Sequence, residues 1–327
     1  MKKRKISYKQ AIYEALREAL IEDKKVVLIG EDIGVYGGAF GVTKGLLEEF
    51  GDERIIDTPI SEASIVGLAL GASLVGIKPV VEIMFMDFIT LCIDQILNHI
   101  TKLKYIYGGK DEVTVPLVIR TPAGAGRRYG ASHSQNLEKL FMGMPGLKIV
   151  APSTPFTAKG LLKAAIADPN PVLFIEGKLL YSKTGEVPEG KYFIPIKEGR
   201  IVQEGQDLTI LSYLHTVALA IEAASILEKD GIKVEVIDLQ TLSPLPWELI
   251  KASLHKTKKI IVVEEGTLTC GIGAEICARL TSECFWDLDA PPQRVATEDL
   301  PIPYSPPLED AAVPSLEKIL LAVEKIF

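Results

Sequence analysis

The chain has 327 residues, of which 47% are hydrophobic and 24% are charged, and this composition excludes a mostly disordered protein. Its formal net charge of −7 argues against nucleic acid or an anionic membrane as the main partner. A chain of this length predicts about two domains, and it can bury enough apolar surface to fold without disulfides or a structural metal.

The N-terminus and the cysteines favour a cytoplasmic protein. The opening MKKRKISYKQAIYEAL passes directly into an amphipathic helix pattern and lacks the apolar centre of a signal peptide. The uncharged stretch at 63–77 is shorter than the roughly 20 residues that span a bilayer. Cys270, Cys277 and Cys284 have the spacing of one helix stripe and form no CxxC pair, so we expect reduced thiols rather than a zinc site.

Apolar segments alternate with helical patterns along the first half of the chain. We expect helices at 7–22, 61–76, 87–106 and 156–168, and strands at 26–30, 79–85, 115–122, 147–153 and 171–177. Uninterrupted apolar strands separated by helices are typical of a parallel sheet that is covered on both faces. The sequence therefore predicts an α/β fold.

Residues 178–205 are polar, contain Pro and Gly and show no period, which predicts a linker or hairpin between domains. The alternation then restarts as a smaller α/β unit of the same class. We expect strands at 207–213, 233–241 and 258–266, and helices at 214–230, 247–255, 271–284 and 315–326. We place the domains at 1–190 and 205–327, joined by a linker at 191–204.

The residues that follow each strand are the candidates for a site, because open parallel sheets bind ligands at the carboxyl ends of their strands. In DTPISE, Ser61 is placed to cap helix 61–76, and Glu62 lies in its first turn. Glu62 either stabilises the helix dipole, by about 0.3–1 kcal/mol, or serves a site. The helix is so apolar that we expect it to be buried, where an unpaired carboxylate is costly. Glu31 and Asp32 are similar candidates.

A glycine-rich loop, GAGRRYGASHSQ at 124–135, follows another strand. Its polar composition predicts a mobile loop that suits a phosphate or an anionic substrate. His133 within it is either a site residue or a structural histidine, and both interpretations stay open. Glu264 and Glu265 end a later strand, and we expect them to cap a helix or to contact another domain, because acids would repel a phosphate there.

Several sequence motifs of other enzyme classes are absent. The sequence has no P-loop, no G-x-S-x-G elbow, no HExxH, and no G-D-G followed by an Asn that would hold a diphosphate through a metal. GEDIGVYGG after the first strand does not match the glycine fingerprint of NAD-binding enzymes. The chain therefore lacks the parts of a self-sufficient nucleotide enzyme.

The order and spacing of DTPISE, HSQ, PGLKIV, KGLLKAAI, VIDLQTLSP, IIVVEEG and GIGAEI resemble those of a known family. This family is the beta subunit of the thiamine-diphosphate-dependent 2-oxo acid dehydrogenases, the decarboxylating components of pyruvate dehydrogenase and its relatives. The resemblance extends from about residue 5 to residue 326. It implies a parallel-sheet pyrimidine-binding domain with the thiamine diphosphate fold, followed by a smaller α/β transketolase C-terminal domain.

The resemblance also implies roles for individual residues. Glu62 matches the glutamate that hydrogen-bonds a pyrimidine ring nitrogen of thiamine diphosphate and favours the tautomer that removes the thiazolium proton. His133 matches a histidine that binds or protonates the 2-oxo acid or its acyl adduct. Met84 and Phe88 match positions that pack near the aminopyrimidine.

Family members also hold a potassium ion in a loop like AIADPN, mostly through backbone carbonyls. On this pattern the ligands are Leu117, Ala165, Ile166, Asp168 and Asn170. Pro169 departs from the family's usual Asn-Asn pair, but it removes a donor and no carbonyl, so the site can survive. The alternative is a plain helix C-terminus followed by a turn.

The expected function is that of the beta subunit of a pyruvate dehydrogenase decarboxylating component, because GRRYGASHSQ resembles pyruvate-type members. An alpha subunit would complete an α2β2 tetramer and hold Mg2+ and the diphosphate, and a lipoyl-bearing acyltransferase would accept the acetyl group. Acetoin and branched-chain 2-oxo acid dehydrogenases use nearly the same beta motifs and stay open as alternatives. A non-catalytic scaffold subunit is a further alternative, and we expect the isolated chain to form homodimers.

Overall fold

The computed structural model describes residues 2–109 and 113–327. The chain forms two compact units. The first consists of the residues up to 123 together with 143–196, and the second consists of 124–142 together with 197–327. The glycine-rich loop therefore belongs to the same unit as the C-terminal residues. The domain limits expected from the sequence stay a prediction.

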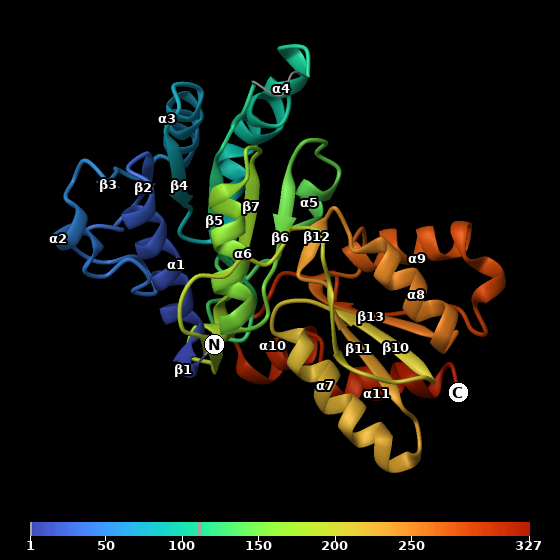
Figure 1. Ribbon diagram of the computed structural model, residues 1–327. Helices are drawn as coiled ribbons and strands as arrows, with labels where there is room; N and C mark the ends of the chain where they lie inside the picture. Colours follow the sequence, from blue (N-terminus) through green and yellow to red (C-terminus); the bar gives the residue numbers. More distant parts are fainter. Residues whose placement is uncertain (1, 110–112) are drawn as a thin grey trace. The chain divides into compact units, whose positions relative to one another are not determined.

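A parallel sheet forms the centre of the first unit (Figure 1). Its strands are β2 (Val26–Gly30), β3 (Ile55–Asp57), β4 (Lys78–Glu82), β5 (Val118–Ala123), β6 (Lys148–Val150) and β7 (Val172–Gly177). They lie in the order β6-β7-β5-β4-β2-β3, and each is parallel to its neighbours. All residues of β2, β5 and β7 are buried, which confirms the α/β class predicted from the uninterrupted apolar runs.

Helices cover this sheet, and a small antiparallel pair lies beside them. The pair is β1 (Lys3–Ser7) with β8 (Thr184–Pro188). The helices are α1 (Tyr8–Glu22), α2 (Leu46–Phe50), α3 (Glu62–Leu74), α4 (Leu103–Ile106) and α6 (Pro155–Ala167), and the short turn η3 covers Lys178–Leu180. The Ser7 hydroxyl caps α1, and Thr154 and Thr157 form a capping box at the start of α6. These local signals explain why both helices begin where the sequence predicts.

The prediction of one long helix at 87–106 is wrong in detail. The backbone winds in the helical sense, but the hydrogen bonds change from 3-10 type in η1 (Met86–Cys92) to π type in η2 (Gln95–Ile100) before α4 begins. Periodicity predicts helical winding but does not specify this change of hydrogen-bond register. Segments of this kind often lie next to functional sites.

An ion-pair ladder joins α1 and α6, which lie side by side in Figure 1. Lys159 Nζ lies 2.6 Å from Glu18 Oε1 and 3.1 Å from Glu14 Oε2. Lys163 Nζ lies 2.7 Å from Glu18 Oε2 and 3.1 Å from Glu22 Oε1. Both lysines are buried, so each ammonium group depends on these carboxylates for its polar contacts.

The second unit contains a second, mostly parallel sheet with the order β14-β13-β10-β11-β9. Among the described strands of this sheet, only β9, at the edge, is antiparallel to its neighbour. The strands of this unit are β9 (Arg200–Gln203), β10 (Leu208–Ser212), β11 (Val234–Asp238), β12 (Thr241–Ser243), β13 (Ile260–Thr267) and β14 (Gln293–Thr297). This unit confirms the second α/β region predicted from the sequence.

Six α-helices and two short turns are described in the second unit. They are α5 (Lys139–Met142), α7 (Thr216–Leu227), η4 (Glu228–Asp230), α8 (Trp247–Thr257), α9 (Ile272–Glu283), η5 (Phe285–Asp287), α10 (Pro306–Ala312) and α11 (Leu316–Glu324). Gly231 adopts the left-handed conformation with φ 84° and ends the α7–η4 segment, as the sequence predicts. The four cysteines are free thiols.

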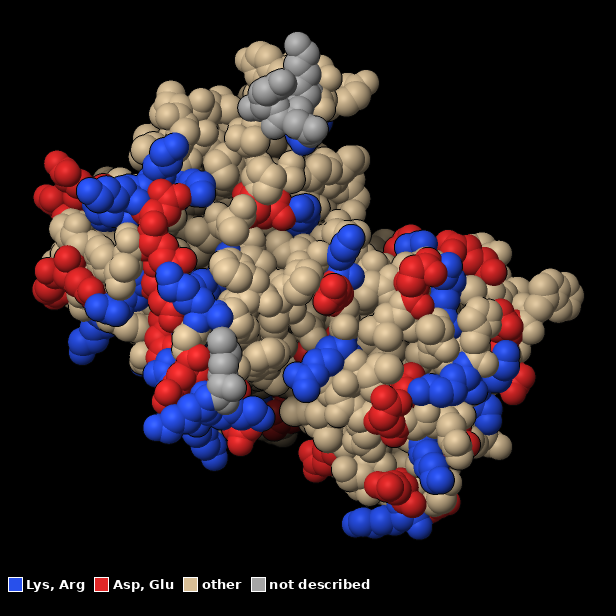
Figure 2. Space-filling view, viewed as in Figure 1, with Lys and Arg blue, Asp and Glu red and all other residues tan. Residues whose placement is uncertain are grey.

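The surface shows no strong separation of charge on the face drawn in Figure 2, where basic and acidic side chains are interspersed. Within the described residues, no helix combines the length and the apolar character that crossing a bilayer requires.

Candidate cofactor and substrate site

Glu62 lies in the first turn of α3, close to the carboxyl ends of β2 and β4. Ser61 occupies the N-cap position, but its hydroxyl donates to Ser64 Oγ (2.9 Å) and caps no backbone amide. The Glu62 side chain is therefore the one acidic group in this turn, and it is only partly buried.

The prediction that the helix after Glu62 is buried is wrong for the single chain. Ile65 and Ala69 pack inward, but Leu68 is 55% exposed and Val75, which follows the helix, is 79% exposed. Only one stripe of α3 contacts the sheet and η1, and the opposite stripe faces outward. An apolar stripe on the surface of a folded chain marks an interaction surface.

The negative charge of Glu62 acts on two neighbouring groups, Glu31 and Cys92. Burial, together with the negative charges of Asp32 and Glu62, raises the pKa of Glu31. Burial and Glu62 raise the pKa of the Cys92 thiol to about 12, so this thiol stays protonated. A carboxylate in such surroundings favours a ligand that presents a protonated or hydrogen-bond-donating nitrogen.

Apolar side chains surround the segment that follows β4. Phe85 packs edge-to-face on Phe88 (6.2 Å between ring centroids) and on Phe40 (5.8 Å). Met84 and Phe88 are half-buried, and η1, which carries Phe88, packs against α3. Glu62, Met84 and Phe88 therefore lie around one edge of the sheet, as their positions after the strands predict.

A buried charge triad lies within the three neighbouring strands β4, β5 and β7. Arg120 donates to Glu176 Oε1 (2.7 Å) and to Glu82 Oε2 (2.8 Å), and Tyr181 donates to Glu176 Oε2 (2.7 Å). Burial works against the charge on Arg120, but Glu176 and Glu82 outweigh it and raise the pKa of the guanidinium above its ordinary value. The triad fixes the strand ends that lead to Met84.

The triad was missed by the sequence analysis, although the sequence contains a signal for it. Each of PVVEIMF, VPLVIRTP and PVLFIEG carries one charged residue inside an apolar strand. Charged side chains are almost never fully buried unless they are paired. Two acids and one arginine in adjacent parallel strands therefore predict such a network once the strand order is known.

His133 lies in the second unit, in the loop that precedes α5. It is half-buried, and the Ser132 hydroxyl lies 2.8 Å from its Nδ1 atom. The expected mobility of this loop stays a prediction, but the expectation that its amides bind an external anion needs correction. The amides of Gly126 and Arg128 donate to the two carboxylate oxygens of Glu309 (2.7 and 3.2 Å), so a carboxylate of the chain occupies the anion position.

A group of buried carboxylates supports the other end of this loop. Asn136 donates to Glu265 Oε2 (2.6 Å), and His215 also contacts Glu265. Tyr213 donates to Glu138 Oε1 (2.6 Å). These groups tie the residues after His133 to β10, β13 and the start of α7.

Glu264 caps α9, as one of the two interpretations of the Glu264–Glu265 pair predicts. Its carboxylate accepts hydrogen bonds from the amides of Ile272 (2.7 Å) and Gly273 (2.9 Å). Burial and the nearby charge of Glu138 raise the pKa of Glu264 to about 7. Burial also raises the pKa of Glu138.

The residues proposed from the resemblance as potassium ligands meet where α6 ends. Asp168 caps the helix, its amide donates to Ala165 O (3.2 Å), and its Oδ1 atom accepts from the Asn170 amide (2.9 Å). Lys148 pairs with the other carboxylate oxygen of Asp168. The carbonyl of Leu117 accepts from the amide of Val172 (2.9 Å), and Ile166 is buried in the last turn of α6. This arrangement fits both a carbonyl-lined cation site and a plain turn.

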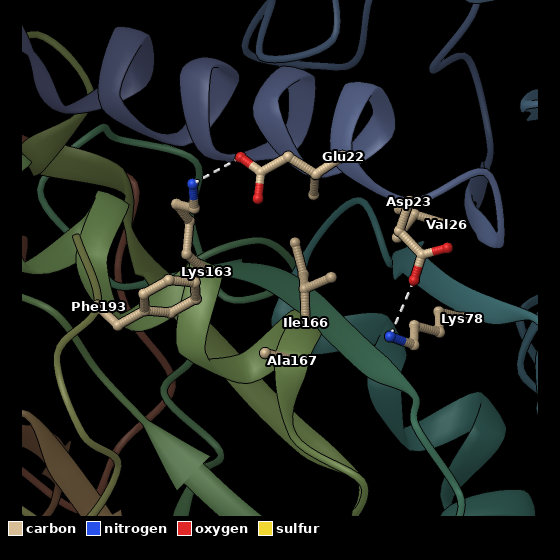
Figure 3. Close-up of a pocket in the computed structure, with 9 residues that line it drawn as sticks. Glu22, Asp23, Val26, Lys78, Lys163, Ile166, Ala167 and Phe193 are labelled. Carbon is tan, nitrogen blue, oxygen red and sulfur yellow. Dashed lines mark hydrogen bonds and ion pairs between the residues drawn. The ribbon is translucent and has the colours of Figure 1, made fainter. Parts of the chain in front are cut away.

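A cavity of about 130 Å³ lies beside the C-terminal ends of α1 and α6 (Figure 3). Ile166 lines it, together with Ala19, Val26, Ala167, Phe193 and four charged residues. The two lysines of the cavity wall pair with its two carboxylates: Lys163 lies 3.1 Å from Glu22, and Lys78 lies 2.9 Å from Asp23. The cavity is thus the open end of the α1–α6 ladder.

Family models match nearly the whole chain. Residues 4–184 match the pyrimidine-binding domain of transketolase, and residues 197–319 match the transketolase C-terminal domain. The chain belongs to the transketolase family.

Curated relatives of this chain include the beta subunits of two kinds of oxidoreductase, which confirms the resemblance to a beta subunit of this class. Subunit beta of a pyruvate dehydrogenase E1 component from Porphyra purpurea is 47% identical, over 96% of this chain and 96% of the relative. Subunit beta of an acetoin:2,6-dichlorophenolindophenol oxidoreductase from Cupriavidus necator is 45% identical, over 98% and 97%. A solved structure titled as a split-gene transketolase, an inactive beta4 tetramer, shares the fold with a TM-score of 0.80, at 24% identity and 98% coverage of both chains.

A transketolase pyrimidine-binding domain implies thiamine diphosphate as the ligand, and residues of the first unit fit its pyrimidine half. A ring nitrogen needs a carboxylate, which Glu62 offers, and the ring needs an apolar surface, which Met84 and Phe88 offer at the same sheet edge. The described residues contain no group of three or more His, Cys, Asp or Glu side chains arranged to hold a metal ion.

Proposed function

We propose that this chain is the beta-type subunit of a thiamine-diphosphate-dependent dehydrogenase and that its substrate is pyruvate. The observation that carries the proposal is Glu62 in the first turn of α3, beside the half-buried Met84 and Phe88. The relatives support the class, because both are beta subunits of about the same length. The loop sequence GRRYGASHSQ favours pyruvate over other 2-oxo acids.

The residues of this chain have separate roles in the proposed reaction. Thiamine diphosphate, when bound, supplies the carbon nucleophile that no amino-acid side chain provides. Glu62 would accept a hydrogen bond from a protonated nitrogen of the pyrimidine ring, and its negative charge would favour that protonated form. Met84 and Phe88 would contact the ring and exclude water, which would strengthen the contact with Glu62. His133, oriented by Ser132, would exchange a proton with an oxygen of the substrate.

The proposed partners follow from the same class. An alpha subunit would hold the diphosphate and Mg2+ and complete an α2β2 heterotetramer, and a lipoyl-bearing acyltransferase would accept the acetyl group. Exposed apolar side chains support subunit association: Leu68 and Val75 lie on or beside α3, and Tyr105 (86% exposed) and Ile106 (64%) lie in α4. Without an alpha subunit, the same surfaces favour a homodimer.

A potassium ion at the end of α6 is a further part of the proposal. The ligands would be Leu117, Ala165, Ile166, Asp168 and Asn170, and because Lys148 and Asn170 already bind the Asp168 carboxylate, backbone carbonyls would supply most of the oxygens. Replacing K+ by choline at equal ionic strength should lower the thermal unfolding midpoint of the assembly by a few degrees. An unchanged midpoint favours the plain turn.

Turnover by the reconstituted assembly tests the substrate. The chain is coexpressed with a partner alpha subunit, and reduction of an artificial electron acceptor is followed with pyruvate, acetoin and branched-chain 2-oxo acids. We expect pyruvate to have the highest kcat/KM, and turnover to require both chains, thiamine diphosphate and Mg2+. A preference for acetoin would favour the second candidate function, which the Cupriavidus necator relative supports.

Replacing Glu62 tests the catalytic proposal directly. Glu62→Gln keeps the size of the side chain but cannot keep the ring nitrogen protonated, so kcat should fall by about 10²–10⁴-fold. Glu317→Gln is the matched control, because Glu317 is an exposed first-turn glutamate of α11, and its kcat should stay within about two-fold. Full activity of Glu62→Gln in an intact tetramer would instead support a non-catalytic scaffold role.

A further inference from the structure

The glycine-rich loop is held by a single buried carboxylate from the C-terminal segment. Glu309 Oε1 accepts the amide of Gly126 (2.7 Å), and Glu309 Oε2 accepts the amide of Arg128 (3.2 Å) and its Nη1 atom (2.6 Å). Glu309 has no solvent-exposed surface. We call this arrangement the loop clamp.

The conformation of the loop is one that binds anions. Gly126 (φ 90°), Arg128 (φ 63°) and Gly130 (φ 68°) all have left-handed backbone angles. Left-handed residues let successive amides point into one concavity, which is a common anion-binding arrangement. A non-glycine residue such as Arg128 holds this angle only where its surroundings stabilise it. Here the carboxylate of Glu309 provides that stabilisation.

A second contact extends the clamp toward His133. A Cβ atom on Gly130 would lie 2.2 Å from the Tyr304 ring, so only glycine lets Tyr304 pack this closely against the loop. The amide of His133 then donates to the carbonyl of Gly130 (3.3 Å). Beyond His133, Asn136 is bound to Glu265. His133 thus lies between two points at which carboxylates of the second unit hold the loop.

The neighbouring Asp310 also pairs with Arg128, but its side chain is 63% exposed. Its carboxylate lies 2.8 and 3.1 Å from the Arg128 guanidinium, in contrast to Glu309, which accepts two backbone amides of the loop. An exposed ion pair of this kind contributes little, whereas the buried Glu309 carboxylate satisfies two backbone amides. The two adjacent acids therefore provide a matched pair for an experiment.

We propose that Glu309 is a positioning residue that fixes the glycine-rich loop and thereby sets the place of His133 in the reaction. The role in the reaction rests on the proposed function, whereas the role in holding the loop does not. Displacing a reacting group by about 1 Å can lower a rate by about 10²-fold, so an anchor far from the chemistry can control kcat.

Hydrogen exchange of the loop amides in the full chain tests the clamp without any assay of activity. Glu309→Gln loses the negative charge and can accept through only one side-chain oxygen, so the amides of Gly126 and Arg128 should exchange at least about 10-fold faster. Asp310→Asn should leave both rates within about two-fold. Unchanged exchange in folded Glu309→Gln would overturn the proposal.

Kinetics of the reconstituted assembly test the positioning role. Glu309→Gln should lower kcat at least about 10-fold and shift its pH profile, while thiamine diphosphate binding, measured by calorimetry, stays within about two-fold because Glu62 is untouched. Faster exchange with unchanged kcat would show a structural anchor only and overturn the positioning role.

A second variant is available if Glu309→Gln does not fold. Arg128→Gln leaves the carboxylate in place and should change the exchange rates and kcat in the same direction but by a smaller factor. Wild-type exchange rates and kcat in this variant would overturn the proposal. An inactive wild-type assembly would contradict the proposed function, while the exchange rates would still decide whether Glu309 holds the loop.

Discussion

Two regions of this protein hold clusters of carboxylates, partly exposed in the first and buried in the second, and they bind them in opposite ways. In the α1–α6 ladder of the first unit, lysine ammonium groups lie between glutamates. In the second unit, Glu138, Glu264 and Glu309 are bound mainly by dipoles, which come from a tyrosine hydroxyl and from backbone amides, with one arginine on Glu309. In the ladder a full positive charge takes the place of water at the carboxylate, whereas in the second unit a dipole mostly does so.

The pKa of the carboxyl group shifts in opposite directions in the two regions. Burial alone would raise the pKa of Glu22 in the ladder, but Lys191 and Lys163 outweigh it and lower that pKa. Burial, followed by the charge of Glu138, outweighs the amide donors of Glu264 and raises its pKa to about 7. Cations beside the accessible Glu22 therefore favour its ionised form, whereas the backbone dipoles at the buried Glu264 leave it able to take up a proton near neutral pH.

Removing a cation from the ladder should have the largest effect on stability. Lys159→Met keeps the length of the side chain but removes a buried ammonium group from Glu14 and Glu18, which retain Arg4 and Lys163 as partners. Breaking a buried pair typically costs about 3–5 kcal/mol, and because both carboxylates retain a cation we expect a loss near the lower end of this range. Urea unfolding at neutral pH measures the loss. Lys9→Met, at an exposed position of α1, is the control and should change stability by less than about 0.5 kcal/mol. A loss below about 1 kcal/mol for Lys159→Met would mean that the ladder contributes little net stability.

Replacing Glu264, the acid bound by backbone amides, should change the pH dependence of the free energy of unfolding. The pKa of Glu264 is about 7 in the folded chain against an ordinary value of 4.5, so the folded state binds this proton more tightly than the unfolded state. Its contribution is fully present below about pH 4.5 and is lost as the pH rises to about 7, for a total of about 3 kcal/mol. Glu264→Gln should flatten the stability curve in this window, because glutamine does not ionise, although its single side-chain oxygen can accept from only one of the two α9 amides.

Thermal unfolding midpoints between pH 5 and pH 8 check this expectation. Glu275→Gln, at an exposed position of the same helix, should leave the wild-type slope unchanged. If the unfolding midpoint of Glu264→Gln changes with pH as steeply as that of the wild type, another group, such as Glu138, takes up the proton.

The sequence predicted the elements whose signals are local. The apolar run at 26–30 became β2 over the same residues, and the helix predicted at 156–168 became α6 with Thr154 as its cap. The hydrogen-bond register of 87–106 was not predictable, because η1 and η2 are only seven and six residues long, too short for their different periods to show in the hydrophobic pattern. The short strand β14 was also not predicted, because its partner strand cannot be recognised from the local sequence.

Long-range pairing limited the prediction of the site. Glu62, Met84 and Phe88 could be placed at one sheet edge because parallel strands end together. The partner of the glycine-rich loop could not be found, since Gly126 and Glu309 are separated by 183 positions in the sequence. Glycine and arginine at 124–130 show that the loop can bind an anion, but they do not show that the chain itself supplies it.

The loop at 124–142 interrupts the first unit in sequence but folds with the second, and this constrains how the gene can be recombined. A chimaera that joins residues 1–196 of this chain to the C-terminal part of a relative would take the loop from one parent and the acid that holds it from the other. Only parents with a glutamate at the position of Glu309 would give a matched pair. A functional exchange between such proteins therefore requires two segments to move together, and a single crossover at the boundary between the family domains would separate them.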